Sequence, residues 1–348
     1  MFSKIFLDII LATALFFAGE GVICRQASPG NKIRLIFYNV ENLFDTIDNP
    51  LTEDDEFLPS GTRRWTDSRY LKKLNAIYKV ISAAGGWEAP ALIGMCEVEN
   101  RKVIEDLLVL TPLGRYGDYR IIHEDSPDPR GIDVCLIYRP DRLRLVDYKY
   151  LYPVSFRVRN FRTRSVLYSR WLAGKDTMHI FLNHWPSRRR GVLAEEVSRR
   201  ELAEMVRKKA DSLFMAQGDC AKIIITGDFN CLPDDREMKI LTMDEGNKIS
   251  SFRLVNLSVQ PAAGGEGSFR YQGLWEMPDQ VIVSGALLSS CQGIHTGQEL
   301  FSVFRHEAFM VKDRKLPGLK PFSTYYGFAY EGGFSDHLPV ILDLILPD

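Results

Sequence analysis

Short runs rich in isoleucine, valine and leucine recur along the chain and are separated by polar or irregular stretches. Runs of this kind, bounded by turn residues, are typical of buried β-strands. The runs read IRLIFYNV, ALIGMCEV, YRIIHED, DVCLIYRP, HIFLNHWP, KIIITGDFN, DQVIVSG and HLPVILDLIL. The pattern therefore predicts a core built from β-sheet.

Between some of these runs, apolar residues recur at the spacing of an amphipathic helix. The first set is Tyr70, Leu71, Leu74, Ile77, Tyr78 and Ile81, the second is Val103, Ile104, Leu107 and Leu108, and the third is Leu202, Met205, Val206, Ala210 and Leu213. The helices are too few to alternate strictly with the strands. Mixed sheets with helices packed outside are therefore expected, rather than a doubly wound sheet or a barrel of strand-helix units.

The size and composition are those of an ordinary globular protein, with 348 residues, 45% hydrophobic and 26% charged. No Pro/Gly/Ser-rich linker, low-complexity tract or repeat divides the chain, so one domain is expected over about residues 30–348. The formal net charge of −1 excludes a protein that is basic throughout. Any site for a polyanion would have to be a local patch.

The first 24 residues, MFSKIFLDIILATALFFAGEGVIC, have the layout of a secretory signal: a lysine, an apolar stretch and then small residues. They are expected to be removed on export, which would place the mature chain in the periplasm, outside the cell, or on the cell surface through a lipid on Cys24. The alternative is a buried first helix, and Gly-Val-Ile before Cys24 is a poor lipoprotein cleavage sequence. The mature chain is expected to be a monomer without a membrane span.

The six cysteines are too few to form a disulfide framework in a chain of this length. Cys96 and Cys135 lie inside strand-like runs and are expected to be buried apolar residues. Cys220 and Cys231 flank a predicted strand, which would hold them beyond bridging distance.

Carboxylate, amide or imidazole groups stand at the ends of six predicted strands. They are Asn39 and Glu41, Glu97 and Glu99, Asn183 and His184, Asp228 and Asn230, Asp279, and Asp336 and His337. Each group alone is an ordinary turn or cap residue. Their repetition is more than turns require, and it indicates a shared site.

The chemistry of this set favours a hard cation. Clustered histidines and cysteines are too few for zinc, whereas the oxygen atoms of Glu97, Asp336 and Asn39 suit Mg²⁺. Magnesium in turn points to a phosphate substrate. His337 could take a proton from an attacking water, and Asp279 is the candidate carboxylate that orients its ring.

Seven segments in this order resemble the endonuclease/exonuclease/phosphatase superfamily, the deoxyribonuclease I-like fold. They are NVENLFD, CEVEN, RGIDVCLIY, NHWPSR, GDFN, PDQVIVS and SDHLPV, within roughly residues 33–346, and GDFN and SDHLPV are the most specific. The resemblance, to a secreted bacterial-type member, implies an α/β (α+β) fold: a four-layer sandwich of two mixed β-sheets packed face to face with helices outside. It also implies phosphoester cleavage with Mg²⁺, for which Mn²⁺ or Ca²⁺ could substitute.

The resemblance also implies roles for individual residues. Glu97 matches the principal metal ligand, Asn39 and Asp336 match positions beside the metal, and His337 matches the base oriented by Asp279. Asp228 and Asn230 match the pair that positions the nucleophile and stabilises phosphoryl charge. His184 matches a second histidine at the phosphate, for which Asp125 is the expected supporting carboxylate, with Glu124 as the alternative.

Arginines supply candidate phosphate contacts. Arg130 matches a family segment near the phosphate, together with Asp133, which could equally be a structural strand-start residue. Arg188 and Arg189, with Arg190, follow His184 closely and are expected to grip phosphates flanking the cleaved bond. The alternative is a solvated loop that leads into a helix whose charges pair on the surface.

Two further segments have open interpretations. Arg63, Arg64 and Trp65 could stack on or grip a substrate, although Trp65 is expected to pack at the start of its helix. The aromatic stretch 322–330 could contact substrate, but packing of a long loop onto the domain is the favoured interpretation.

The leading expectation is an exported Mg²⁺-dependent phosphodiesterase, an endonuclease that acts on DNA or RNA with little sequence preference because phosphate contacts carry no base information. The alternative is a phosphatase or phospholipase-type hydrolase acting on inositol phosphates, sphingomyelin or another small phosphoester. A binding module without catalysis is disfavoured, since every expected catalytic position holds a competent residue.

Overall fold

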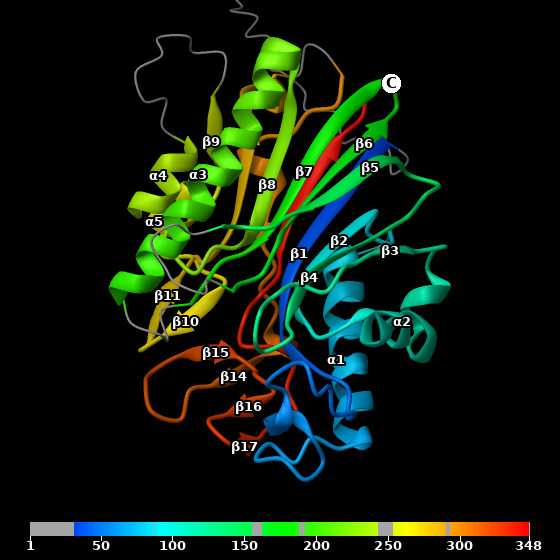
Figure 1. Ribbon diagram of the computed structural model, residues 1–348, viewed down its shortest axis with the longest axis vertical. Coiled ribbons are helices and arrows are strands. Elements are labelled where there is room, and N and C mark those ends of the chain that lie inside the picture. The colour runs from blue at the N-terminus through cyan, green and yellow to red at the C-terminus, as the bar shows by residue number, and fades with distance from the viewer. Residues whose placement is uncertain are drawn as a thin grey trace, which may run out of the picture.

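The computed structural model describes residues 31–86, 88–154, 162–187, 192–242, 253–289 and 293–347 (Figure 1). The predicted leader, residues 1–24, and the arginines Arg188, Arg189 and Arg190 lie outside these ranges.

Two six-stranded sheets form the centre of the protein. The first has the order β13-β18-β1-β2-β4-β3 and comprises β1 (Lys32–Leu43), β2 (Leu92–Val98), β3 (Arg120–Ile122), β4 (Asp133–Tyr138), β13 (Phe301–Val303) and β18 (Val340–Ile345). The second has the order β5-β6-β7-β8-β12-β9 and comprises β5 (Arg144–Leu151), β6 (Val166–Ala173), β7 (Asp176–His184), β8 (Lys222–Asp228), β9 (Leu254–Asn256) and β12 (Asp279–Ser284). Both sheets are mixed, because β1–β2 and β7–β8 pair in parallel and the other pairs are antiparallel.

Helices cover the outer face of each sheet (Figure 1). Helices α1 (Asp67–Gly85) and α2 (Arg101–Leu110) pack against the first sheet. Helices α3 (Val192–Gln217) and α4 (Arg236–Thr242) pack against the second sheet. The short α5 (Val259–Ala263) and 3₁₀ turns at Asp55–Phe57, Pro112–Arg115, Gly218–Cys220, Gly285–Leu288, Gln298–Leu300 and Glu307–Phe309 complete the helical elements of the described chain. The predicted four-layer sandwich is confirmed.

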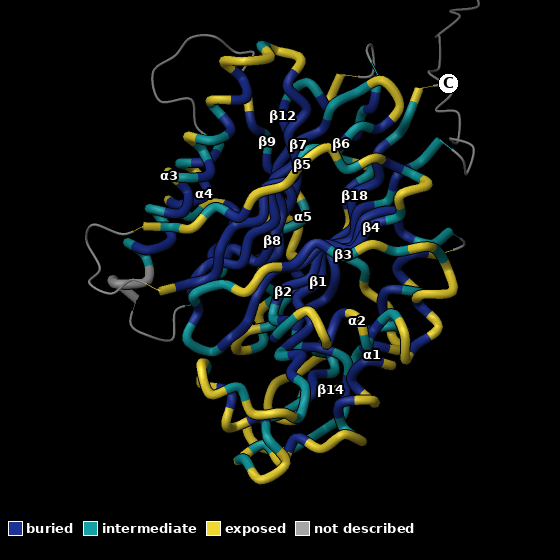
Figure 2. The backbone as a smooth tube through the Cα atoms, turned by 45° about the vertical axis from the view of Figure 1, so that its right-hand side comes forward, coloured by how far each residue is buried: buried dark blue, intermediate teal, exposed yellow. Residues whose placement is uncertain are grey.

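Strand β1 shows why the apolar runs predicted strands correctly. Ile33, Leu35 and Phe37 point into the core between the two sheets, whereas the alternate residues Ile36 and Tyr38 point into the core under α1 and α2. Successive side chains of a strand face opposite sides, so a strand between two cores must be apolar at nearly every position. Figure 2 shows the central strands buried along most of their length.

Local signals place the helix ends. Asn100 is the N-cap of α2, and its Oδ1 accepts a hydrogen bond of 3.1 Å from the backbone N–H of Val103. The last residue of CEVEN thus begins the helix that follows β2. Helix α1 ends at Gly85, and Gly86 then adopts a φ of +71°, a value that glycine tolerates best.

Three small antiparallel ribbons lie at one end of the sandwich (Figure 1). They are β10 (Phe269–Tyr271) with β11 (Leu274–Glu276), β14 (Met310–Lys312) with β15 (Leu319–Pro321), and β16 (Tyr325–Tyr326) with β17 (Ala329–Tyr330). Trp65 is fully buried, donates to the Phe44 carbonyl at 2.9 Å and contacts the rings of Tyr325 and Tyr330. Packing is therefore the role of Trp65.

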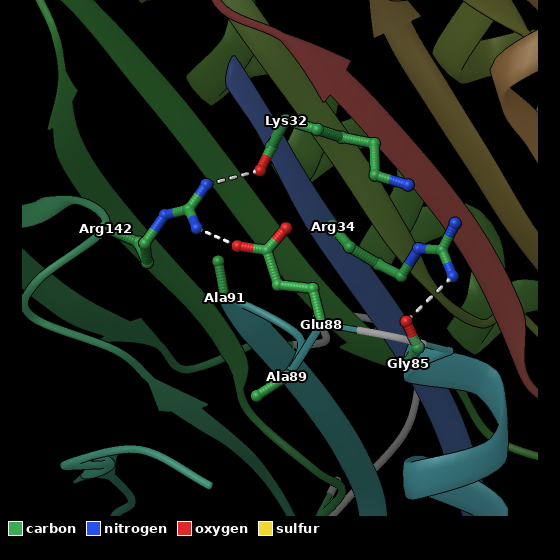
Figure 3. A pocket seen from close by; sticks show the side chains of 7 residues that line it. All are labelled: Lys32, Arg34, Gly85, Glu88, Ala89, Ala91 and Arg142. Atoms are coloured by element: carbon green, nitrogen blue, oxygen red, sulfur yellow. Dashed lines mark hydrogen bonds and ion pairs between the residues drawn. The ribbon is translucent and has the colours of Figure 1, made fainter. Parts of the chain in front are cut away.

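A small pocket borders the beginning of β1, near its first residue (Figure 3). The Arg34 guanidinium holds Asp343 through two N–H···O bonds of 2.7 Å and donates to the Ala84 carbonyl at 2.7 Å. Arg142 pairs with Glu88 and donates to the Lys32 carbonyl at 2.7 Å. These guanidinium groups are engaged in tying β1, β18 and the end of α1 together.

Among the residues that the structure describes, no helix combines the length and the hydropathy needed to cross a bilayer. The described cysteines Cys96, Cys135, Cys220 and Cys231 are unbridged, as expected for the last pair.

The topology brings the polar strand ends to one edge. The parallel pairs β1–β2 and β7–β8 end at Leu43, Val98, His184 and Asp228. The antiparallel β12 begins beside the end of β8, because Asp279 pairs with Asp228, and β18 begins beside Phe37. All six predicted strand ends therefore meet at one end of the sandwich.

Candidate active site

His337 is held by a carboxylate from the neighbouring sheet. Its Nδ1 lies 2.7 Å from Oδ2 of Asp279, and the same oxygen accepts a 2.5 Å bond from the Ser268 hydroxyl. The Ser335 hydroxyl accepts from the His337 backbone N–H at 3.1 Å and donates to the Asn39 carbonyl at 2.8 Å. Hydrogen bonds thus hold the SDH segment on both sides, and the Asp279 carboxylate contacts the ring that it was predicted to orient.

The other ring nitrogen of His337 faces Asp228. Its Nε2 lies 4.0 Å from Oδ2 of Asp228. Burial alone would lower the pKa of His337, but the bonded Asp279 and the nearby Asp228 and Asp336 raise it well above its ordinary value. A divalent cation among the same carboxylates would offset this effect, because it would neutralise the charges that hold the proton.

Asn39 joins two of the predicted metal-site carboxylates. Its Nδ2 donates to Asp228 Oδ2 at 2.9 Å and approaches Glu97 Oε1 at 3.5 Å. Its Oδ1 accepts from the backbone N–H of Glu41 at 3.0 Å, which fixes the orientation of the amide. Asn39 therefore presents a donor to the carboxylates, and its predicted role as an oxygen ligand would need the amide turned over.

Glu97 sits in a backbone conformation that few side chains adopt. Its φ is +63°, in the left-handed region, and the pairing of β2 with its neighbours is irregular at this point. The backbone N–H of Asn42, itself at a φ of +53°, donates to Glu97 Oε2 at 2.9 Å. Bulges and left-handed residues re-aim side chains and cluster at functional sites, so the strand irregularity itself marks Glu97.

Negative charge accumulates at this edge. Burial and Asp279 raise the pKa of Asp228 above its ordinary value, and burial, with Glu97 contributing, raises that of Asp336. Burial and Asp336 likewise raise the pKa of Glu41. Several carboxylates therefore share one poorly solvated region.

Lys73 of α1 is a buried, positively charged residue that was not predicted from the sequence. Its Nζ donates to the Thr324 hydroxyl at 2.5 Å and the Phe334 carbonyl at 2.7 Å, and lies 3.9 Å from Glu41 Oε2. It stands three residues after Tyr70 on the apolar face of its helix, which is a signal in the sequence for a buried charged residue. Its charge balances part of the carboxylate cluster.

His184 lies at the same site but lacks the support that was expected. Its Nε2 is 3.9 Å from both Glu97 Oε1 and Asp228 Oδ2. Its buried Nδ1 has no hydrogen-bond partner among the described residues. Burial, with Arg164 and Arg130 adding to it, holds the pKa of His184 well below its ordinary value, so the ring is neutral.

The prediction that Asp125 supports His184 is wrong. The Asp125 side chain is 84% exposed, and its carboxylate lies 4.0 Å from Nδ1 of a different histidine, His123. The alternative, Glu124, accepts instead from the Tyr152 hydroxyl at 3.3 Å. The loop after β3 turns these two side chains outward, and chain order alone does not indicate that turn.

The RGID segment serves mainly to shape this loop. Asp133 accepts from the Ser126 backbone N–H at 2.8 Å and lies 3.2 Å from the His123 ring, so it has the structural strand-start role. The Nε atom of Arg130 lies 3.8 Å from Asp128, and its charge is close enough to the site to lower the pKa of His184. It thus remains a candidate for phosphate contact.

Arg164, which the sequence reading did not single out, links this loop to β7. It donates to Asp128 at 2.8 Å and to the Trp185 carbonyl at 2.6 Å. Asn230 donates to the same carbonyl at 2.9 Å, while its backbone N–H donates to Asp228 Oδ1 at 2.9 Å. Asn230 thus orients Asp228.

Asn183, in contrast, is structural. It donates to the Thr226 carbonyl at 3.2 Å and accepts from the Trp185 indole at 3.1 Å, within the core. Of the polar residues at this strand end, only His184 faces the site.

The residues at this edge fit a hard divalent cation. Glu97, Asp228 and Asp336 supply carboxylate oxygens, and burial raises the pKa of Asp228 and of Asp336, as expected for carboxylates in a poorly solvated site. Divalent cations such as Mg²⁺ take oxygen ligands of this kind. Asp228, Asp279 and His337 also form a group whose potential ligand atoms lie within 4.8 Å of one another.

Comparison with known proteins agrees with this geometry. The model of the endonuclease/exonuclease/phosphatase family matches residues 34–345. No curated protein matches the chain.

Solved structures share the fold at low sequence identity. A family protein from Bacteroides thetaiotaomicron matches with a TM-score of 0.57 at 16% identity, covering 91% of this chain and 95% of that one. A mannosyl-6-phosphatase from the same organism matches with a TM-score of 0.53 at 16% identity, covering 90% of this chain and 99% of that one. The human Nocturnin catalytic domain with a bound sulfate anion matches with a TM-score of 0.52 at 15% identity, covering 91% of this chain and 95% of that one. The match of the family model over almost the whole described chain shows that this protein belongs to the endonuclease/exonuclease/phosphatase family.

Proposed function

We propose that the protein is a Mg²⁺-dependent phosphodiesterase that cleaves nucleic acid through attack by a water molecule. Members of its family hydrolyse phosphoesters. The observation that carries the proposal is the His337–Asp279 pair, aimed at Asp228 beside Glu97.

The geometry of His337 suits activation of a water. With Nδ1 donating to Asp279, and with a bound cation offsetting the carboxylate charges that raise the pKa of His337, Nε2 would be left to accept a proton. It lies 4.0 Å from Asp228 Oδ2. One water can bridge two groups at that separation, since each hydrogen bond spans about 2.8 Å. His337 would take the proton of this water while Asp228 positions it.

The other residues would act on the phosphate. Glu97, with Asp336 nearby, would hold Mg²⁺, which when bound neutralises charge on a phosphate oxygen. The neutral ring of His184 could contact the phosphate from the opposite side, and Arg130 supplies positive charge near it. The arrangement matches the requirements of phosphoester hydrolysis.

A cluster of basic and aromatic side chains supports nucleic acid as substrate. The Arg63 guanidinium carbon lies 4.9 Å from the centre of the Tyr325 ring and 5.0 Å from that of Phe328, and Phe328 is 70% exposed. Arg69 lies 4.2 Å from the centre of the Tyr330 ring. Exposed aromatic rings beside cations are used to stack bases and hold phosphates.

This cluster adjoins the metal edge. The backbone N–H groups of Thr324 and Tyr325 donate to the Glu41 carboxylate at 2.6 and 3.3 Å, and Glu41 follows Asn39 by two residues. A strand held at the catalytic edge could therefore extend onto the aromatic residues.

Hydrolysis assays test the proposal and its alternative together. The protein from residue 25 onward is incubated with single-stranded DNA, plasmid DNA, RNA, an inositol phosphate, sphingomyelin and mannose 6-phosphate, each with Mg²⁺ and with EDTA. Faster Mg²⁺-dependent cleavage of nucleic acid supports the proposal. Faster turnover of a small phosphoester would replace the nuclease with a phosphatase or phospholipase, and no turnover of any substrate would contradict both.

We also propose that the protein is exported, on the signal-like layout of residues 1–24. N-terminal sequencing and cell fractionation test this proposal. A cytoplasmic protein that still carries Met1 would contradict it.

A further inference from the structure

A thiol lies at the floor of the site beside the metal-site residues. The sulfur of Cys96, a ring nitrogen of His184 and a carboxylate oxygen of Asp228 all lie within 4.8 Å of one another. Cys96 ends the regular part of β2, whereas His184 and Asp228 end β7 and β8 of the other sheet. The group therefore spans the two sheets, within the buried region that Figure 2 shows around β2 and β8.

None of these side chains is a surface group. Cys96, His184 and Asp228 are 0%, 3% and 1% exposed. The Nδ1 atom of His184 is buried without a hydrogen-bond partner among the described residues, which is unusual because buried polar atoms are nearly always paired. The other ring nitrogen, Nε2, lies 3.9 Å from Asp228 Oδ2. The His184 ring, with its Nδ1 unpaired, therefore stands beside a thiol and a carboxylate as an incomplete coordination set.

The sulfur, nitrogen and oxygen donors of Cys96, His184 and Asp228 suit Zn²⁺, whereas the carboxylate oxygens of the catalytic edge suit Mg²⁺. Zn²⁺ takes sulfur at about 2.3 Å and nitrogen or oxygen at about 2.0–2.2 Å in tetrahedral geometry, which places ligand atoms roughly 3.5 Å apart. His184 Nε2 and Asp228 Oδ2 lie 3.9 Å apart, so small side-chain movements would close the set. Mg²⁺ has little affinity for thiolate or imidazole and leaves Cys96 unused.

Glu97 is placed to complete the tetrahedron. Its Oε1 lies 3.9 Å from His184 Nε2, and its side chain keeps 15% of its surface exposed, which gives a path from solvent. Loss of the thiol proton to solvent would accompany binding, because zinc binds the thiolate.

We propose that Cys96, His184 and Asp228 form a Zn²⁺ site that overlaps the catalytic metal site and inhibits the enzyme when zinc occupies it. Zinc would withdraw Asp228 from the attacking water and His184 from the phosphate. The inhibition rests on the proposed function, whereas the binding does not.

Cobalt absorption tests the binding without any substrate. Co²⁺ is added to metal-free protein, and the thiolate-to-cobalt charge-transfer band and the visible bands of tetrahedral cobalt are recorded. Cys96→Ser and Cys96→Ala are compared with Cys135→Ser, which alters an equally buried thiol of β4, and with Cys220→Ser, which alters an exposed one. Circular dichroism selects the Cys96 variant that is folded.

The expected result is a charge-transfer band in the unsubstituted protein and both controls, with loss of the band in the folded Cys96 variant. Absence of the band from the unsubstituted protein would overturn the proposal. The proposal would also be overturned if the charge-transfer band persisted in the folded Cys96 variant, or if it were lost in Cys220→Ser.

Zinc titration of the Mg²⁺-supported reaction tests the inhibition. Loss of the thiolate ligand is expected to raise the zinc concentration for half-inhibition at least about tenfold in the Cys96 variant. Equal inhibition of both proteins would refute the inhibitory role. If no substrate is hydrolysed, the proposed function fails while the cobalt spectra still decide whether the site binds metal.

Discussion

Replacement of Asp279 by asparagine tests the central pair of the site. Oδ2 of Asp279 accepts bonds of 2.7 Å from His337 and 2.5 Å from Ser268, and its residue is fully buried. Asn has the same shape, so the fold should persist. The change removes the negative charge that fixes the tautomer of His337 and stabilises the imidazolium formed when the ring takes a proton.

The size of the effect follows from that bond. A hydrogen bond to a charged group is worth about 1.5–3 kcal/mol, and about 1.4 kcal/mol corresponds to a tenfold change in rate. Loss of the bond alone therefore predicts a decrease in kcat of about 10- to 150-fold. Population of the wrong tautomer would extend the loss toward about 10⁴-fold, as in other carboxylate–histidine pairs. KM should change little, because Asp279 acts through His337 and does not face the substrate.

Steady-state kinetics on the best substrate, with Mg²⁺ saturating, measure kcat and KM. Asp343→Asn is the matched control, since this carboxylate also holds a cationic partner, Arg34, but lies near the beginning of β1, away from the site. It should lower the melting temperature without lowering kcat. A folded Asp279→Asn protein with kcat within about twofold of the unsubstituted enzyme would refute the reasoning, and so would an equal loss of kcat in the control.

Other changes test the charges around the site. Glu97→Ala should weaken Mg²⁺ binding by at least about 100-fold in calorimetric titration while the melting temperature of the metal-free protein is kept, because the mutation removes a principal ligand; unchanged affinity would contradict its role. Lys73→Met should lower the free energy of unfolding by about 3–5 kcal/mol in urea, since it leaves Glu41 and Asp336 without their buried cation; a loss below about 1 kcal/mol would count against that role. Burial raises the pKa of Glu99 from 4.5 to about 8, so the unfolded chain releases this proton at lower pH than the folded one, and the group destabilises the fold as pH rises from about 4.5 to 8. Glu99→Gln should therefore gain stability relative to the unsubstituted protein across that window, by at most about 1.4 kcal/mol per pH unit in urea unfolding, and a stability difference independent of pH would refute the shift.

The sequence alone determined the secondary-structure elements and supplied the candidate residues for the site. Ile223, Ile224 and Ile225 of β8 are consecutive apolar residues because the strand lies between two cores, the second residue facing one core and the other two facing the opposite one. This local property can be recognised without knowledge of the partners. The polar groups at the ends of these runs indicated which residues are candidates for the chemistry. Asp279, which holds His337, was identified in the same way.

Only the tertiary structure decided which of the polar groups face one another. Asp125 and Asp133 lie in one short segment, yet the turn of the loop exposes the first and buries the second against His123. Ser268, which directly precedes β10, donates to Asp279. Lys73 of α1 donates to the Phe334 carbonyl, a contact between residues 261 positions apart in the chain.

Cys96 shows the same difference between what the sequence pattern predicts and what the tertiary structure decides. Cys96 was correctly expected to be buried, because that depends on the apolar run around it. Its place beside His184 and Asp228 depends on how the two sheets pack face to face, and it was not predicted. Hydrophobic periodicity acts along a strand, whereas the contacts of a side chain across two sheets depend on register and packing, which the pattern of a single strand does not contain.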